Sequence, residues 1–242
     1  MLGSPTAARP RLRLSLCALA VLLGIAAIVA IAGCGGGSSS GNGVSSKSAD
    51  EILVATKAAA SAASSVHVTG TLASHGTPIT LDMSLAAGKG GKGKLSENGL
   101  SFELIVVDET IYIKGSPSFY DHFGGSSAAQ LFQGKWLKAP ADKGELASLA
   151  SLANLGKILD QSLASTGSLT KGSTSTVNGQ PVIELTDSTK SGSLFVATTG
   201  DPYPVQIRKH GAETGQVSFS DWNQPVDLTA PANAIDIGQL GK

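Results

Sequence analysis

Two glycine-rich runs have spacings that enzymes use to bind phosphate or to hold a nucleophile. Residues 88–93 read Gly-Lys-Gly-Gly-Lys-Gly and match G-x-G-x-x-G, while residues 37–41 match the G-x-S-x-G of serine hydrolases. A phosphate-binding loop needs a following helix whose N-terminus faces the phosphate, but the residues after 93 alternate like a strand, and Leu95 replaces the required Ser or Thr. The second run lies in a flexible Gly/Ser segment. We therefore expect a hairpin loop at 88–93 and no nucleophile at 37–41.

The histidines and cysteines indicate no catalytic or metal site. His67, His75, His122 and His210 are scattered, and no pair has the i, i+4 helical spacing of a zinc site. Asp121 and His122 could join a distant serine in a triad, but nothing in the sequence marks that serine. With only two cysteines, one of them in the apolar leader, an internal disulfide and a thiolate zinc site are both excluded for the mature chain. The sequence predicts a protein that is not an enzyme and has no cofactor or metal.

The remaining cysteine has a context that predicts acylation. Three arginines within residues 9–13 precede an apolar stretch at 14–32, and residues 31–34 read Ile-Ala-Gly-Cys, which resembles the lipobox of bacterial lipoproteins. In such proteins the cysteine thiol receives a diacylglyceryl group and the peptide is cut just before it. Cys17 does not fit, because Leu16 is too large for the position before the cut. Cys34 is the predicted lipid-attachment residue.

A transmembrane helix is the alternative for the same stretch, since its 19 apolar residues fall within the roughly 17–25 that span a bilayer. A Gly/Ser tether begins directly after Cys34, which favours the lipoprotein. We assign 1–33 to a signal peptide, 34–47 to the acylated cysteine and a flexible tether, and 48–242 to a single domain. Both interpretations hold the domain at the extracytoplasmic face of the cell membrane.

The charge balance excludes nucleic acid as a partner. The chain has 18 basic and 18 acidic residues, and removal of the signal peptide leaves 15 against 18, a net charge of −3. Binding to nucleic acid requires a clustered basic face that displaces counterions from phosphates. Charged residues make up only 15% of the chain and aromatic residues 5%.

Beyond residue 47 the hydrophobic period predicts helix, strands, helix and strands again. Residues 48–65 begin with Ser48 and Glu51 at capping-box spacing, and residues 143–165 carry leucines at steps of three and four. Between and after these helices, apolar and polar side chains alternate, and Asn178-Gly179 is a strong hairpin signal. Short turns between strands predict an antiparallel sheet and an α+β fold. The predicted strands cover 66–72, 79–85, 102–106, 111–113, 169–177, 181–187, 194–198, 203–209 and 216–222.

Several segments together resemble the LppX/LprG lipoproteins of mycobacteria and their actinobacterial relatives, over roughly residues 46–232. They are, besides the lipobox, SVHVTG (65–70), IYIK (111–114), GKWLK (134–138), NGQPV (178–182), GDPYPV (200–205) and FSDWNQPVDLTAP (219–231). The family is similar in fold to the LolA/LolB carriers. The resemblance implies a strongly curved antiparallel half-barrel with helices over its concave face.

The resemblance also implies a function and a site. Members related to LprG hold acylated glycolipids or other long-chain lipids between sheet and helices, and the family has no catalytic residues to carry over. We expect an acylated lipid or glycolipid as ligand, an envelope transporter as partner and a monomeric, membrane-anchored chain; the alternative is an anchored structural or interaction module with a filled core. The inward strand positions predicted to line the cavity are Val68, Leu72, Leu81, Met83, Leu85, Phe102, Leu104, Val106, Ile111, Ile113, Val205 and Ile207.

Overall fold

The computed structural model describes residues 41–74, 76–143, 146–164, 167–189, 191–211 and 214–239. The predicted signal peptide, Cys34 and the first part of the tether lie outside these ranges. The chain divides into two units between Ser38 and Ser39, and the fold described below is that of the second unit. Within the described ranges, no helix combines the length and the apolar character needed to cross a bilayer.

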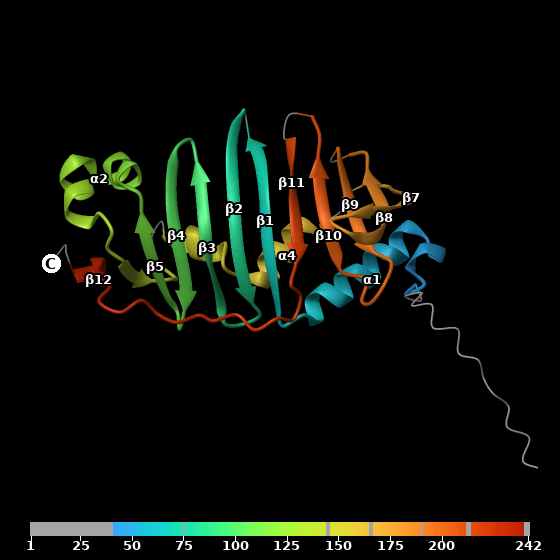
Figure 1. Cartoon of the computed structure of the whole chain (residues 1–242), viewed down its shortest axis with the longest axis horizontal. Coiled ribbons are helices and arrows are strands. Elements are labelled where there is room, and N and C mark those ends of the chain that lie inside the picture. Colours follow the sequence, from blue (N-terminus) through green and yellow to red (C-terminus); the bar gives the residue numbers. More distant parts are fainter. Residues whose placement is uncertain are drawn as a thin grey trace, which may run out of the picture. The chain divides into compact units, whose positions relative to one another are not determined.

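One large sheet forms the body of the domain (Figure 1). Its strand order is β12-β6-β5-β4-β3-β2-β1-β11-β10-β9-β8-β7, and every neighbouring pair is antiparallel except β12 and β6. The predicted α+β class with an open, curved antiparallel sheet is confirmed. The strands are β1 (Ser65–Ser74), β2 (Thr77–Ala86), β3 (Gly90–Glu97), β4 (Leu100–Val107), β5 (Thr110–Gly115), β6 (Leu137–Pro140), β7 (Leu169–Val177), β8 (Gln180–Asp187), β9 (Gly192–Ala197), β10 (Pro204–Lys209), β11 (Thr214–Ser220) and β12 (Ile235–Asp236).

Tight turns connect most of these strands, and the pairing of β1 with β11 joins the two runs of hairpins. Asn178 and Gly179 both have positive φ, as the predicted hairpin requires, and so do Asp108 and Glu109 between β4 and β5. In the middle of the sheet, β1 pairs with β11, so that His67 lies opposite Ser220. The sheet therefore consists of two runs of hairpins that meet at this pair.

The first helix, α1 (Ala49–Ala62), begins with the predicted capping box, in which Ser48 and Glu51 bond each other's backbone. It covers β8 and β9, where Ile52 packs with Ile183, Leu185 and Val196. The predicted tether ends earlier than residue 47, because residues 44–46 form the short 3-10 helix η1 (Val44–Ser46) and Val44 is buried in the same cluster. The ordered packing of the domain thus already includes residues 41–47.

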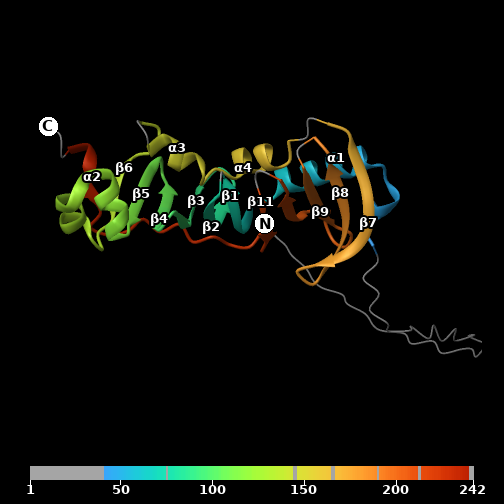
Figure 2. The same cartoon turned by 90° about the horizontal axis from the view of Figure 1, so that it is seen from above.

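The helix predicted over 143–165 is two helices in the structure, α3 (Leu146–Ser151) and α4 (Leu155–Ser162). The single-helix prediction was wrong because Asn154 lies within the leucine repeat and caps the second helix, its side chain accepting from Lys157 N–H at 3.0 Å. Both helices lie with α1 along one face of the sheet (Figure 2). The break lets the leucine stripe change direction along that face.

A helix that the sequence pattern did not predict, α2 (Pro117–Phe132), covers the β4–β6 end of the domain (Figure 1). Ser116 caps it by accepting from Phe119 N–H at 3.2 Å, and proline occupies its first position. The helix is broken at Gly125, whose φ of 74° and ψ of 177° are reached easily only by glycine. Two short arms of helix therefore meet at an angle at this position.

Three apolar clusters form the core, all within the second unit. The largest joins the inward faces of β1, β2, β4, β5 and β11 to α3 and α4, with Leu155, Leu159 and Leu163 buried on the helical side. The second lies under α1. The third lies on the other side of β8 and β9, where Val182 and Phe195 alternate with the residues under α1. The second unit therefore contains its own complete core.

Candidate apolar binding site

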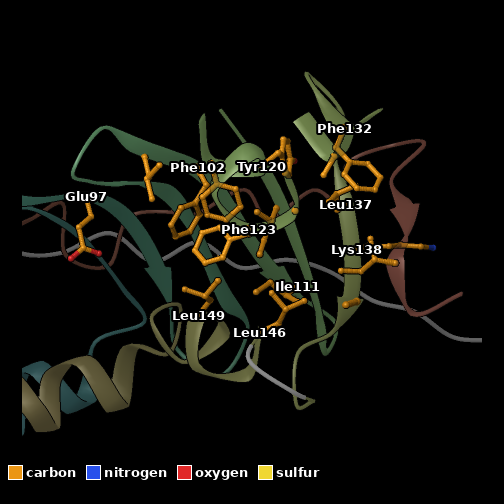
Figure 3. A pocket seen from close by; sticks show the side chains of 17 residues that line it. Glu97, Phe102, Ile111, Tyr120, Phe123, Phe132, Leu137, Lys138, Leu146 and Leu149 are labelled. Carbon is orange, nitrogen blue, oxygen red and sulfur yellow. The ribbon is translucent and has the colours of Figure 1, made fainter. Parts of the chain in front are cut away.

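An apolar cavity of about 550 Å³ lies at the β4–β6 end of the sheet, beneath α2 (Figure 3). This volume falls in the range of roughly 300–1,000 Å³ that is usual for ligand pockets. Strands β4, β5 and β6 form its floor, and α2, α3 and the 3-10 helix η2 (Ile237–Gln239) form its walls. The lining residues are Glu97, Leu100, Phe102, Ile111, Ile113, Phe119, Tyr120, Phe123, Gly124, Ala128, Phe132, Leu137, Lys138, Ala139, Leu146, Leu149 and Ile237.

Aromatic rings are concentrated in this wall, although they are scarce in the chain. Four of the six phenylalanines line the cavity. The Phe119 ring lies 5.1 Å from Phe102 and 4.9 Å from Phe123, and the Tyr120 ring lies 5.8 Å from Phe132. Gly115 permits this arrangement, because a Cβ there would lie 2.4 Å from the Phe119 ring. The rings connect β4 to both arms of α2 and form an apolar side of the cavity.

The polar atoms in the wall are either paired within the protein or directed away from the cavity. The Tyr120 hydroxyl accepts from Gly115 N–H at 2.9 Å and donates to the Lys135 carbonyl at 3.3 Å. Burial raises the pKa of this phenol, so it stays protonated and keeps donating near neutral pH. Glu97 and Lys138 point their charged ends away from the aromatic side chains (Figure 3). The interior therefore suits an uncharged, apolar ligand.

The structure brings only three of the twelve predicted lining residues into this cavity: Phe102, Ile111 and Ile113. Most of the others belong to the large core cluster, where they contact each other and the helices. Leu72 is half-buried near the far end of β1, outside the three clusters. Whether the predicted residues contact a lipid stays a prediction. Those in the large cluster, apart from the three in the cavity, are Val68, Leu81, Met83, Leu85, Leu104, Val106 and Ile207.

Val205 lies on a different side of the sheet from Ile207. The pairing of β10 with β9 shifts register between Pro204 and Gln206, which is a β-bulge. Val205 is consequently buried with Phe195 in the third cluster, and Ile207 packs against the large cluster. Strict alternation of side chains predicted that Val205 and Ile207 lie on the same face of the sheet. That holds only for a strand without a bulge.

The sequence pattern did not predict α2 and therefore did not predict the part of the cavity wall that this helix forms. Apolar residues of α2 are interrupted by Gly124-Gly125 and by a polar run after it, so no helical stripe extends over its full length. A signal for its start was nevertheless present, since Ser116-Pro117 is a favourable N-cap and first helical position. Phe119 and Phe123, four residues apart, then indicate one helical face.

The opposite face of the sheet carries a charged cluster around His67. Its Nε2 lies 2.8 Å from Asp82 Oδ1, and its Nδ1 lies 3.4 Å from Ser220 Oγ and 3.5 Å from Asp221 Oδ2. The Ser220 hydroxyl donates to Asp221 at 3.2 Å, and both aspartates are exposed, unlike the buried carboxylate of a hydrolase triad. The arrangement links β11, β1 and β2.

The structure also shows where the remaining candidate motifs lie. The glycine-lysine run at 88–93 forms the turn after β2 and the start of β3, so the predicted hairpin is confirmed and no helix follows it. Asp121 and His122 lie on the exposed side of α2, where the His122 ring packs edge-on against Phe123 at 4.9 Å. Among the described residues, no group of His, Cys, Asp or Glu has a metal-binding arrangement.

Solved structures of other proteins have a similar fold. LprF from Mycobacterium bovis superimposes with a TM-score of 0.53 at 16% identity, covering 76% of this chain and 97% of LprF. The chain has the fold of LprF. The predicted structural resemblance to LppX/LprG-type proteins is thereby confirmed. The lipoprotein LppX from Mycobacterium tuberculosis gives a TM-score of 0.48 at 18% identity, over 74% of this chain and 99% of LppX. No protein-family model matches the sequence, and a search of curated proteins found no match.

Proposed function

We propose that the protein is a lipid-anchored, non-enzymatic carrier that binds an acyl chain of a lipid or lipoglycan in the cavity beneath α2 and presents it within the cell envelope. The observation that supports this most strongly is the cavity itself, which is apolar and of ligand size. Each buried CH₂ group contributes about 0.8 kcal/mol, so a chain of ordinary length offsets its removal from a bilayer without directional contacts.

The charged side chains of the described wall point away from the cavity, which suggests which part of a ligand would lie inside and which outside. An acyl chain would occupy the space between the rings and Leu149, while a polar headgroup would remain outside. Burial of an uncompensated charge in such a site would cost several kcal/mol, so free anionic headgroups are poor occupants of the interior. The anchor on Cys34 would keep this carrier at the membrane from which its ligand comes.

The test is native mass spectrometry, with organic extraction, of a chain that begins at Gly35 and is expressed in a lipid-rich actinobacterium. The wild type should co-purify with long-chain lipid. Leu149→Trp should fill the cavity from α3 and lose that lipid, whereas Val54→Trp, on the exposed side of α1, should retain it. Lipid that remains bound to a folded Leu149→Trp protein would place the ligand elsewhere and overturn the proposal.

The anchor requires a separate measurement. Palmitate labelling of the full chain and globomycin-sensitive processing should both be observed for the wild type and both be lost in Cys34→Ala. Labelling that survives the substitution would contradict acylation at Cys34.

A second candidate function is an anchored interaction module without lipid cargo. It is favoured by the middle of the domain, where the leucines of α4 contact the sheet directly. A wild-type protein that is free of lipid and binds no added glycolipid in the same experiment would support this alternative.

A further inference from the structure

The chain after β11 crosses the sheet as an extended strap and ends beside the cavity. This strap, residues 221–239, runs past one end of the central strands and finishes in β12 and η2 (Figure 1). Strand β12 pairs in parallel with β6 over only two residues, at Leu137 and Lys138. Ile237 of η2 then lines the cavity. The end of the strap is therefore one part of the cavity wall.

The base of the strap is fixed to the domain by several hydrogen bonds and a ring stack. The Asn223 N–H donates to the Ser65 carbonyl at 3.0 Å. The Asn223 side chain donates to the Tyr203 hydroxyl at 2.8 Å and accepts from Ser64 N–H at 2.8 Å. The Trp222 ring stacks on Tyr203, with centroids 4.5 Å apart, and packs against the large apolar cluster. The strap cannot leave the sheet at this end unless all of these contacts break together.

The middle of the strap lies loosely over the sheet. Residues 225–234, all of them described, form hydrogen bonds only within the stretch, from Thr229 to Asp227. Val226 and Leu228 are half-buried and belong to none of the three apolar clusters. A hollow of about 360 Å³ lies between the start of this stretch and strands β1 and β2. Few contacts are therefore lost if the middle of the strap moves.

The far end of the strap is held by a short latch, which consists of β12 and η2. Its Ile235 N–H donates to the Trp136 carbonyl at 2.8 Å. Ile235 and Ile237 are only half-buried and lie outside the three apolar clusters. Segments with few buried apolar contacts and few backbone hydrogen bonds open locally while the rest of a domain stays folded. The latch has these properties, whereas the base of the strap does not.

We propose that the latch is a gate, whose release from β6 opens the cavity at this edge of the sheet and lets an acyl chain enter or leave while the base keeps the strap attached. The proposal rests on the proposed lipid-binding function and concerns how that site is reached. Because Ile237 lines the cavity only in the latched state, a bound acyl chain favours that state. The pairing of β12 also covers the edge of β6, but this structural role alone would not affect the rate of ligand exchange.

A reversible disulfide across the latch tests the gate, because the chain that begins at Gly35 contains no cysteine. Asp236→Cys and Lys138→Cys place two thiols on registered neighbours of β12 and β6. Oxidation should slow uptake and release of cis-parinaric acid at least about tenfold in stopped-flow fluorescence, with its affinity unchanged within about twofold. Reduction of the same protein should restore its own rates. Thr170→Cys with Thr186→Cys, a registered pair at the opposite edge of the sheet, is the matched control and should exchange fatty acid equally fast in both redox states.

The outcomes separate the gate from the carrier function. Equal rates for the oxidised and reduced latch pair would overturn the gate and leave the carrier function standing. Equal slowing by the control disulfide would also overturn the gate, because the effect would then come from any cross-link in the sheet. A wild type that binds no fatty acid would overturn the carrier function and the gate with it.

Hydrogen exchange of the unmodified chain tests the gate without a substitution. The amides of Ile235 and Asn223 lie at the two ends of the strap and make hydrogen bonds of similar length, 2.8 and 3.0 Å. After correction for intrinsic rates, the Ile235 amide should exchange at least about tenfold faster than the Asn223 amide. Saturating cis-parinaric acid should slow exchange at Ile235 and leave Asn223 unchanged. Equal protection of the two amides, or an Ile235 rate that the fatty acid does not change, would contradict the gate.

Discussion

Two parts of the same helical layer bury the inner face of the sheet differently. Over β1, β2 and β11, Leu155 and Leu159 of α4 are buried in the large apolar cluster. Over β4–β6, α2 bends at Gly125 and leaves about 550 Å³ between aromatic rings and strands. The comparison indicates that an open site does not require a loosely packed domain. The cavity lies where the covering helix α2 bends at Gly125.

Removal of a side chain from the filled part should have the largest effect on stability. We expect Leu159→Ala to lower the free energy of unfolding by about 2–5 kcal/mol, because the truncation leaves a cavity among buried neighbours. Leu149→Ala, in the half-buried wall of the open part, should cost less than half as much. Urea unfolding followed by circular dichroism measures both. Equal losses would mean that the two parts are packed to the same density.

The bend in α2 should be sensitive to the residue at position 125. Gly125→Ala should lower the free energy of unfolding by about 1–3 kcal/mol, because φ of 74° with ψ of 177° is strained for any residue with a Cβ. Hydrogen exchange should show faster opening of α2 than of α4. Ser126→Ala, on the exposed side of the same helix, is the matched control and should change stability by less than about 0.5 kcal/mol. A neutral Gly125→Ala would show that the bend is not imposed by this backbone geometry.

The smallest expected effect concerns α1, far from the cavity, and depends on pH. The Glu51 carboxylate accepts from the Ser48 hydroxyl at 2.7 Å and from its backbone N–H at 2.9 Å, and these bonds hold the Glu51 pKa below its usual 4.5. A lowered pKa in the folded state adds stability above pH 4.5, and this contribution is lost as pH falls through the lowered value. The stability difference between wild type and Glu51→Gln should therefore shrink below pH 4.5. A difference that stays constant down to pH 2 would contradict the capping role.

The sequence predicted features that depend on neighbouring residues in the chain. Alternation located nine of the twelve strands within a few residues and missed β3, β6 and β12. Ser48 and Glu51 identified the start of α1, and Asn178-Gly179 identified a hairpin. Each of these signals acts over two to four residues, so a single sequence carries it completely. The α+β class and the antiparallel sheet followed from the same local patterns.

Features that depend on tertiary packing could not be predicted in this way. Nothing near Phe102 indicates that four phenylalanines from β4 and α2 meet, because their contact follows from the placement of α2 across the strand ends. The bulge beside Val205 reverses a side chain through the pairing of β10 with β9, which local alternation does not record. Three of the twelve predicted residues consequently lie in the cavity, and six of its seventeen lining residues come from a helix that was not predicted.

The pairing of β1 with β11 has a consequence for how the protein matures. Strand β11 lies about 150 residues after β1, so the two hairpin runs remain separate sheets, each with an unpaired edge, until nearly the whole chain has been synthesised. Closure of this seam is a slow, non-local step. A protein truncated before Thr214 would retain most of its hairpins yet expose two unpaired strand edges, and such fragments should aggregate or be degraded.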